Sequence, residues 1–168
     1  MARFLVALAL FGVVAMTAAS GDAPKEWSGK PWLGKFVAEV SDKSENWEAF
    51  VDALGLPDQY PRAQLKTIHS FYKQGEHYHH ILSLPDKNIN KDIEFTLGQE
   101  VEIKHGEHSL KIKYFEDGNK LVADVSIPAK GKSIHDVYDV QGDQLIKSYK
   151  VGDVVAKKWF KKVANPAA

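Results

Sequence analysis

The feature that most constrains the fold is a series of short alternating segments that fills residues 67–163. In each segment apolar and polar residues alternate with a period of two, which is typical of a β-strand with one buried face. Turns that contain glycine separate most of the segments, as at Gln74-Gly75 and Gln141-Gly142-Asp143. The nine predicted strands are 67–73, 76–84, 92–97, 99–104, 109–115, 120–127, 133–140, 144–150 and 154–163.

One further strand and two helices are predicted before this series. The segment 35–40 alternates in the same way and predicts a first strand. Within 44–55 the apolar residues recur at helical spacing, which predicts an amphipathic helix that ends before Pro57. Pro61 suits the first turn of a second short helix, which we expect to run to about Thr67.

The order of one strand, two helices and nine strands predicts a mainly β fold with ten strands. Regularly spaced short strands are typical of a sandwich or a barrel. Ser, Thr, His, Lys and Glu occur on both faces of several of the predicted strands. This pattern favours a barrel with a cavity of mixed polarity over a sandwich with a dry core.

The composition excludes several classes of function. The 168 residues include 22 basic and 22 acidic side chains, which indicates one domain without net charge. Such a balance gives no electrostatic basis for binding nucleic acid. The sequence has no cysteine, so the fold cannot depend on disulfides. It also has no Gly-x-Ser-x-Gly, HExxH or phosphate-binding glycine-rich loop, so we predict a protein that is not an enzyme and needs no cofactor.

The first 20 residues have the pattern of a secretory signal peptide. One basic residue, Arg3, precedes an apolar run over 4–16, and small residues occupy 17–20. A membrane anchor is the alternative, but a bilayer span needs about 20 apolar residues. We therefore predict a secreted, extracellular protein with a signal peptide at 1–20 and an N-terminal extension at 21–31.

A second pattern is carried by a set of motifs spread along the chain. In chain order they are Trp32-Leu33-Gly34-Lys35-Phe36, Asn46-Trp47-Glu48-Ala49-Phe50, Arg62, Asp92-Ile93-Glu94-Phe95-Thr96-Leu97-Gly98, Asp117-Gly118-Asn119-Lys120-Leu121 and the closing segment 154–163. Through these motifs the chain resembles the fatty acid-binding protein family, whose members are mostly cytoplasmic lipid-binding β-barrels. The leader and the N-terminal extension resemble the secreted members of that family from nematodes.

The resemblance implies a ten-stranded antiparallel up-and-down β-barrel (a β-clam) over 32–164, followed by a C-terminal tail at 165–168. It implies a helix–turn–helix lid between the first and second strands. It further implies a monomer that carries a long-chain fatty acid, a retinoid or a related lipid, and that meets a membrane surface during ligand transfer. Phe50, Leu54 and Ile68 then belong to the lid or to the strand beside it and contact the ligand; the alternative is that they only pack the helices onto the barrel.

The headgroup contacts of the family are present only in part. Its last strand typically carries Arg-x-Tyr, and the aligned residues here are Lys158-Trp159-Phe160. A lysine supplies charge without the planar fork of arginine, and Phe160 has no hydroxyl. Because a buried carboxylate needs a cation or several hydrogen-bond donors, Lys158 is the predicted headgroup contact. The alternative is that Lys158 points outward like Lys157, since a slip of one residue reverses every side chain of a strand.

Three other side chains are candidate ligand contacts. Tyr138 and Tyr149 can each donate a hydroxyl to the headgroup, although strand tyrosines are more often ordinary half-buried aromatics. Arg62, on the predicted second helix, can contact an anionic membrane or the headgroup, or it can simply face solvent. The predicted ligand-binding residues are therefore Lys158, Phe160, Tyr138, Tyr149, Arg62, Phe50, Leu54 and Ile68.

Two alternatives to a lipid carrier stay open at this point. His77 and His79 share one face of a strand, and His69 on the adjacent strand would supply a third ligand for a weak metal site, one fewer than a closed zinc site needs. A secreted interaction protein on the same barrel, without physiological lipid binding, would instead need an exposed apolar patch. That patch would lie around Trp27, Trp32 and Trp159.

Overall fold

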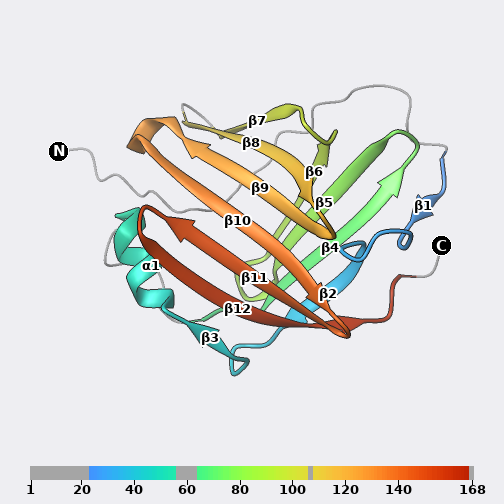
Figure 1. Ribbon diagram of the computed structural model, residues 1–168, viewed down its shortest axis with the longest axis horizontal. Helices are drawn as coiled ribbons and strands as arrows, with labels where there is room; N and C mark the ends of the chain where they lie inside the picture. The colour runs from blue at the N-terminus through green and yellow to red at the C-terminus, as the bar shows by residue number, and fades with distance from the viewer. Residues whose placement is uncertain (1–22, 56–63, 106–107, 167–168) are drawn as a thin grey trace.

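The protein is described by a computed structural model, which covers residues 23–55, 64–105 and 108–166 (Figure 1). The predicted signal peptide lies outside these residues, as does Arg62. The strands are β1 (Lys25–Glu26), β2 (Gly34–Ala38), β3 (Ser44–Glu45), β4 (Thr67–Gln74), β5 (His77–Leu84), β6 (Ile89–Phe95), β7 (Glu100–His105), β8 (His108–Asp117), β9 (Lys120–Ile127), β10 (Lys132–Gln141), β11 (Gln144–Val151) and β12 (Val154–Val163). The helices are α1 (Trp47–Leu54) and two 3₁₀ turns, Pro85–Lys87 and Pro128–Lys130.

The ten longer strands form one antiparallel sheet in the order β6-β5-β4-β2-β12-β11-β10-β9-β8-β7. The last strand, β12, pairs with the first long strand, β2, so these two strands are neighbours in the middle of the sheet. The successive strands β6 and β7 form the two edges of the described sheet, which curves around one interior (Figure 1). The fold is a nearly closed barrel, and the predicted ten-stranded β-barrel is confirmed.

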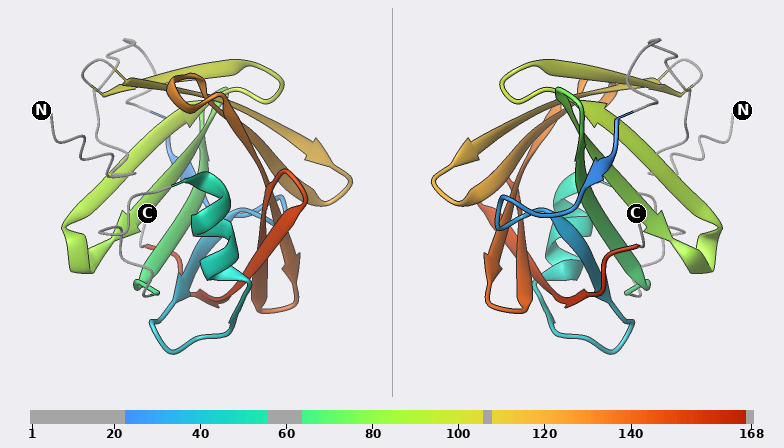
Figure 2. Two further views of the ribbon diagram at one scale, coloured as in Figure 1. Left: turned by 90° about the vertical axis from the view of Figure 1, so that its left-hand side faces the viewer. Right: turned by 90° about the vertical axis from the view of Figure 1, so that its right-hand side faces the viewer.

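The helix α1 covers one end of the barrel. Seen from that end, it lies in front of the interior, between the green strands β4 to β6 and the orange and red strands β10 to β12 (Figure 2, left). Its buried side chains, Phe50, Val51 and Leu54, recur at helical spacing, as predicted. Gly55 ends the helix with φ 63°, a left-handed conformation that glycine adopts without strain.

The lid contains one described helix where two are predicted. Residues 61–63 of the predicted second helix lie outside the described residues. The rest of it is not helical, because residues 64–66 have no regular secondary structure and β4 already begins at Thr67. Thr67 pairs with Ala38 of β2, and β-branched Thr67 and Ile68 suit that strand better than a helix. Within the described ranges, no helix has both the length and the apolar character required to cross a bilayer.

The N-terminal extension packs against the barrel. Its short strand β1 pairs with the end of β4, and the ring of Trp27 lies 4.9 Å from that of Tyr72. Trp32 is fully buried, and its indole N–H donates to Glu116 Oε1 over 2.9 Å. Lys30 Nζ lies 2.8 Å from the same carboxylate oxygen, so the extension is fixed to β8 as well as to β4.

The buried side chains form two clusters. One is built around Trp32, Phe36, Phe71 and Phe160 and fills the end of the barrel where the N-terminal extension packs. The other joins α1 to β10, β11 and β12 through side chains such as Phe50 and Ile134. Between these clusters the barrel is not completely filled, and this space is the candidate site.

Candidate functional site

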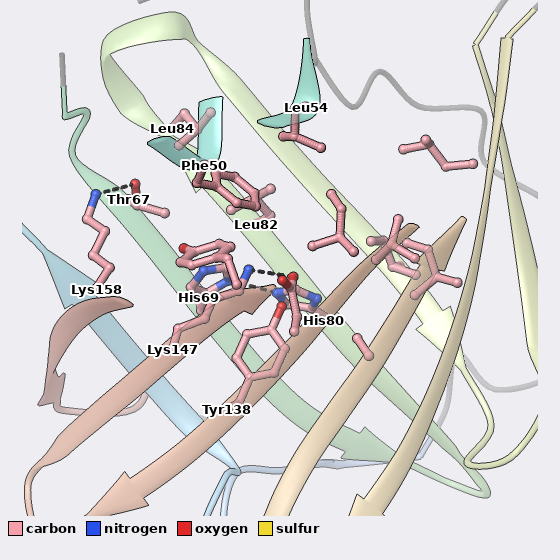
Figure 3. Close-up of a pocket in the computed structure, with 18 of the residues that line it drawn as sticks. Phe50, Leu54, Thr67, His69, His80, Leu82, Leu84, Tyr138, Lys147 and Lys158 are labelled. Carbon is pink, nitrogen blue, oxygen red and sulfur yellow. Dashed lines mark hydrogen bonds and ion pairs between the residues drawn. The ribbon is translucent and has the colours of Figure 1, made fainter. Parts of the chain in front are cut away.

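A cavity of about 170 Å³ lies beneath α1 inside the barrel (Figure 3). This volume is many times the space that one buried water molecule needs. Most of the lining is apolar and comes from α1 and from strands on both sides of the barrel. The apolar lining includes Phe50, Val51, Leu54, Leu82, Leu84, Leu110, Ile112, Val125, Ile127 and Ile134.

A buried ion pair forms part of the polar lining. Lys147 Nζ lies 3.0 Å from Asp136 Oδ2, and both side chains are more than nine-tenths buried. The ammonium also lies 4.7 Å from the ring centroid of Tyr138 and 4.2 Å from that of Tyr149. Burial lowers the pKa of Lys147 and raises the pKa of Asp136, while each charge opposes the shift of the other. The pair has no net charge, whichever of the two groups holds the proton.

Lys158 is the second lysine of the cavity and lies directly opposite Lys147 in the register of β11 and β12. It is 3 % exposed, and its Nζ donates to the Leu65 carbonyl oxygen over 2.8 Å and to Thr67 Oγ1 over 3.2 Å. Both acceptors are uncharged, and no ion pair joins Lys158 to a described carboxylate. Burial, and to a lesser degree the charge of Lys147, lowers the pKa of Lys158 to about 8.

Two buried histidines and a tyrosine form a chain of hydrogen bonds beside the ion pair. His69 Nδ1 lies 2.8 Å from His80 Nε2, and His80 Nδ1 lies 2.9 Å from the Tyr114 hydroxyl. The pKa of each histidine lies well below the usual value, mainly because the side chain is buried, so both are neutral at pH 7. The cavity therefore contains one cation, Lys158, that forms no ion pair with a described acid, although the charge of Asp42 partly opposes the lowering of its pKa.

The structure brings together five of the eight predicted ligand-binding residues. Phe50, Leu54, Tyr138, Tyr149 and Lys158 all line the cavity, and Lys158 points inward. The inward direction of Lys158 follows from strand alternation, because Ala156 and Phe160 are buried on the same face of β12.

The other three predicted residues do not line the described cavity. Phe160 is fully buried below it, where its ring lies 5.0 Å from that of His69. Ile68 does not line the cavity, because the flanking Thr67 and His69 line it and Ile68 lies on the opposite face of β4. Arg62 lies outside the described residues.

The predicted histidine metal site does not form. His69 faces the interior, whereas His77 and His79 lie on the outer face of the adjacent strand, so the three side chains cannot bind the same metal ion. His77 Nδ1 lies 3.1 Å from Thr96 Oγ1, and His79 Nδ1 lies 2.9 Å from Asp92 Oδ1. In the part of the chain that the structure describes, no group of three or more histidine and acidic side chains is placed to hold a metal ion.

The apolar surface patch expected for an interaction protein is also not formed as predicted. Trp32 is fully buried, Trp27 packs on Tyr72, and Lys43 Nζ lies 4.0 Å from the ring centroid of Trp159. Because the three tryptophans are separately covered, they give no continuous apolar surface, and no described feature favours this alternative.

Sequence comparison places the chain among proteins from tardigrades. Secretory-abundant heat soluble protein 68234, from a tardigrade of the genus Hypsibius, is 82% identical over 166 residues, which are 99% of this chain and 95% of that protein. The chain belongs to the secretory-abundant heat soluble family. No protein-family model matches the chain. The expected membership of a nematode subgroup is not supported, because the relatives that define the family here come from tardigrades.

The fold of this family member is shared with solved structures. A crystal structure of a secretory-abundant heat soluble protein from Ramazzottius varieornatus has a TM-score of 0.77 and 48% identity, over 82% of this chain and 99% of that chain. A Schistosoma mansoni fatty acid-binding protein in complex with arachidonic acid has a TM-score of 0.68 over 80% of this chain and 97% of that chain. At 22% identity, this second likeness shows the fold alone.

Liver fatty acid-binding protein of Bos taurus is a more distant relative by sequence. It is 32% identical over 134 residues, which are 77% of this chain and 97% of that protein. The chain and the fatty acid-binding proteins therefore share a barrel, which is what the motifs of the sequence predict.

The sequence prediction missed the ion pair and the hydrogen-bonded histidines inside the barrel. The signal was present in the strand alternation. Lys147 shares its face of β11 with the buried Leu145 and Tyr149, and Asp136 shares its face of β10 with the buried Ile134 and Tyr138. A charged residue between two inward apolar neighbours must itself point inward, and a buried charge needs a partner of opposite sign.

Proposed function

We propose that the protein is an extracellular carrier, and not an enzyme, that reversibly binds a long-chain fatty acid or a related lipid such as a retinoid inside the barrel. The observation that carries this proposal is an apolar cavity that contains one cation, Lys158, without an acidic partner among the described residues. The names of its relatives, secretory-abundant proteins and a fatty acid-binding protein, support secretion and a lipid ligand respectively.

Binding is driven by the transfer of the acyl chain from water into the cavity. Each buried CH₂ contributes roughly 0.8 kcal/mol, so a long chain supplies most of the affinity. The headgroup is held by the Lys158 ammonium, while Phe50 and Leu54 of α1 cover the chain. The carrier is a monomer. It exchanges its ligand at the α1 end, where it takes the lipid from an anionic membrane surface or releases the lipid to it.

Lys158→Met tests the headgroup contact. Methionine keeps much of the length and apolar bulk of the side chain but removes its charge. A hydrogen bond to a charged group contributes about 1.5–3 kcal/mol, so oleate affinity should fall roughly 10- to 100-fold. The measurement is the displacement of a fluorescent fatty acid from the delipidated protein.

Two controls separate this effect from a general loss of binding. Methyl oleate carries no charge, so its affinity should change little in Lys158→Met. Lys157→Met removes a charge from the exposed face of the same strand and should leave oleate binding unchanged. Equal losses for oleate and methyl oleate in Lys158→Met would exclude Lys158 as the carboxylate contact.

The pH dependence of binding gives an independent prediction. The free protein has a pKa of about 8 at Lys158, and a bound carboxylate raises that pKa further. Oleate affinity should therefore be constant from pH 6.5 to about 7.5. It should then fall by up to tenfold per pH unit above about 8, as the free protein loses the proton that the complex retains. Titrations of oleate and methyl oleate across this range measure the effect, and an oleate affinity that is flat to pH 9.5 would contradict it.

A further inference from the structure

We propose that Lys158 also captures lipid aldehydes, such as retinaldehyde or a long-chain fatty aldehyde, as a reversible imine inside the barrel. This inference rests on the proposed function, because the aldehyde must occupy the same cavity as the fatty acid. It adds a covalent activity and a second chemical class of ligand to that site.

The surroundings of the Lys158 amine carry the proposal. The side chain faces the cavity and is 3 % exposed, so a carbonyl group can reach it only from within the barrel. Its two hydrogen-bond partners, the Leu65 carbonyl at 2.8 Å and the Thr67 hydroxyl at 3.2 Å, are neutral acceptors and do not hold it in the charged form as a carboxylate would. A second ammonium, Lys147, lies directly opposite in the strand register.

These surroundings make Lys158 a better nucleophile than an ordinary lysine. A lysine that is desolvated, or that lies beside another cation, is the usual imine-forming residue, because more of it is present as the free amine. Both conditions hold here, and with a pKa of about 8 roughly a tenth of Lys158 is free amine at pH 7. An exposed lysine with a pKa of about 10.4 has less than about a thousandth in this form.

Lys147 is a poorer candidate, although it lines the same cavity. Its Nζ is 3.0 Å from Asp136 Oδ2 and is flanked by the rings of Tyr138 and Tyr149, so, unlike Lys158, it has a paired carboxylate that favours its charged form. Its role beside Lys158 is electrostatic, because its charge disfavours a second ammonium nearby.

The reaction needs no reagent beyond the aldehyde. The lone pair of Lys158 Nζ attacks the carbonyl carbon, a C–N bond forms, and the carbonyl π electrons move to the oxygen. Transfer of a proton from nitrogen to that oxygen gives a carbinolamine. The hydroxyl takes up the one proton that the Lys158 ammonium gave to the solvent when it became the free amine, and it leaves as water while the nitrogen lone pair forms the C=N bond. The product is an iminium with one N–H, which donates to the Leu65 carbonyl in place of the ammonium. The apolar lining favours the product, because it limits the water that would hydrolyse the imine.

Reductive trapping tests the proposal. The delipidated mature protein is incubated at pH 7.5 with one equivalent of retinaldehyde or of cis-9-octadecenal, reduced with sodium cyanoborohydride, digested and mapped by mass spectrometry. We expect one secondary-amine adduct, with Lys158 labelled at least about tenfold more than any other lysine because of its larger free-amine fraction. Excess oleate should suppress this adduct, since it occupies the same cavity.

Three variants keep the test decisive. Lys158→Met should lose the adduct, and exposed Lys157→Met should retain it. Lys158→Arg keeps the charge but cannot form an imine, so it should bind oleate and give no adduct at this position.

Labelling spread over exposed lysines without enrichment at Lys158 would overturn the proposal. If oleate binds in a parallel titration but Lys158 is not labelled, the imine is excluded and the carrier stands; if neither ligand binds, the carrier is excluded too.

Discussion

Asp136→Asn should lower the free energy of unfolding by about 3–5 kcal/mol. The substitution keeps the shape of the side chain but removes the carboxylate that lies 3.0 Å from Lys147 Nζ. An ammonium that is more than nine-tenths buried then has no counter-charge, and it must either stay charged at high cost or lose its proton. Urea unfolding at pH 7, followed by tryptophan fluorescence, measures the change.

Two matched variants isolate the buried pair. Asp124 makes a similar contact at the surface, with His135 Nδ1 2.6 Å away and both side chains about half exposed, so Asp124→Asn should change the stability by less than about 1 kcal/mol. The double variant Asp136→Leu with Lys147→Met replaces the pair by apolar groups and should recover most of the stability lost in Asp136→Asn. Equal effects of Asp136→Asn and Asp124→Asn would show that the pair is not buried as described.

Trp32→Ala should cost a similar amount, about 3–5 kcal/mol. Trp32 has no exposed surface, and its ring packs 5.1 Å from that of Tyr78 and 6.0 Å from that of Phe71. Its removal leaves a cavity at the end of the barrel and takes the indole donor from Glu116. Thermal and urea unfolding measure the loss.

A conservative variant separates packing from hydrogen bonding at this position. Trp32→Phe keeps an aromatic ring but not the N–H donor, so it should cost less than half as much as Trp32→Ala. Trp27→Ala, on the outer face against Tyr72, should cost less again because Trp27 is only partly buried. If Trp32→Ala were as stable as Trp27→Ala, the Trp32 ring would not be part of the core as described.

The features that the sequence predicts well depend on local periodicity. Alternation and glycine turns located every long strand, and the spacing of Phe50, Val51 and Leu54 located α1. The same alternation decides the direction of Lys158, once its face of β12 is fixed by Ala156 and Phe160. Strand pairing then follows from the order of the hairpins.

The features that the sequence did not predict depend on which strands become neighbours and on the phase of each strand. The contact of His69 with His80 requires the register of β4 against β5, and the pairing of Lys147 with Asp136 requires that of β10 against β11. The family resemblance places Ile68 in the lid or in the strand beside it, but the strand phase gives the cavity face to polar Thr67 and His69. Apolar character indicates burial of some kind, and it does not distinguish the cavity from the outer face of a barrel strand.

The most direct test of the carrier proposal is native mass spectrometry of the mature protein after secretion, before and after delipidation. We expect the secreted protein to carry an additional mass that matches a fatty acid or related lipid, to lose it on delipidation, and to regain one equivalent of ligand when oleate is added. Absence of any bound mass, together with no uptake of oleate or retinol by the delipidated protein, would contradict the proposal that the cavity is a lipid-binding site.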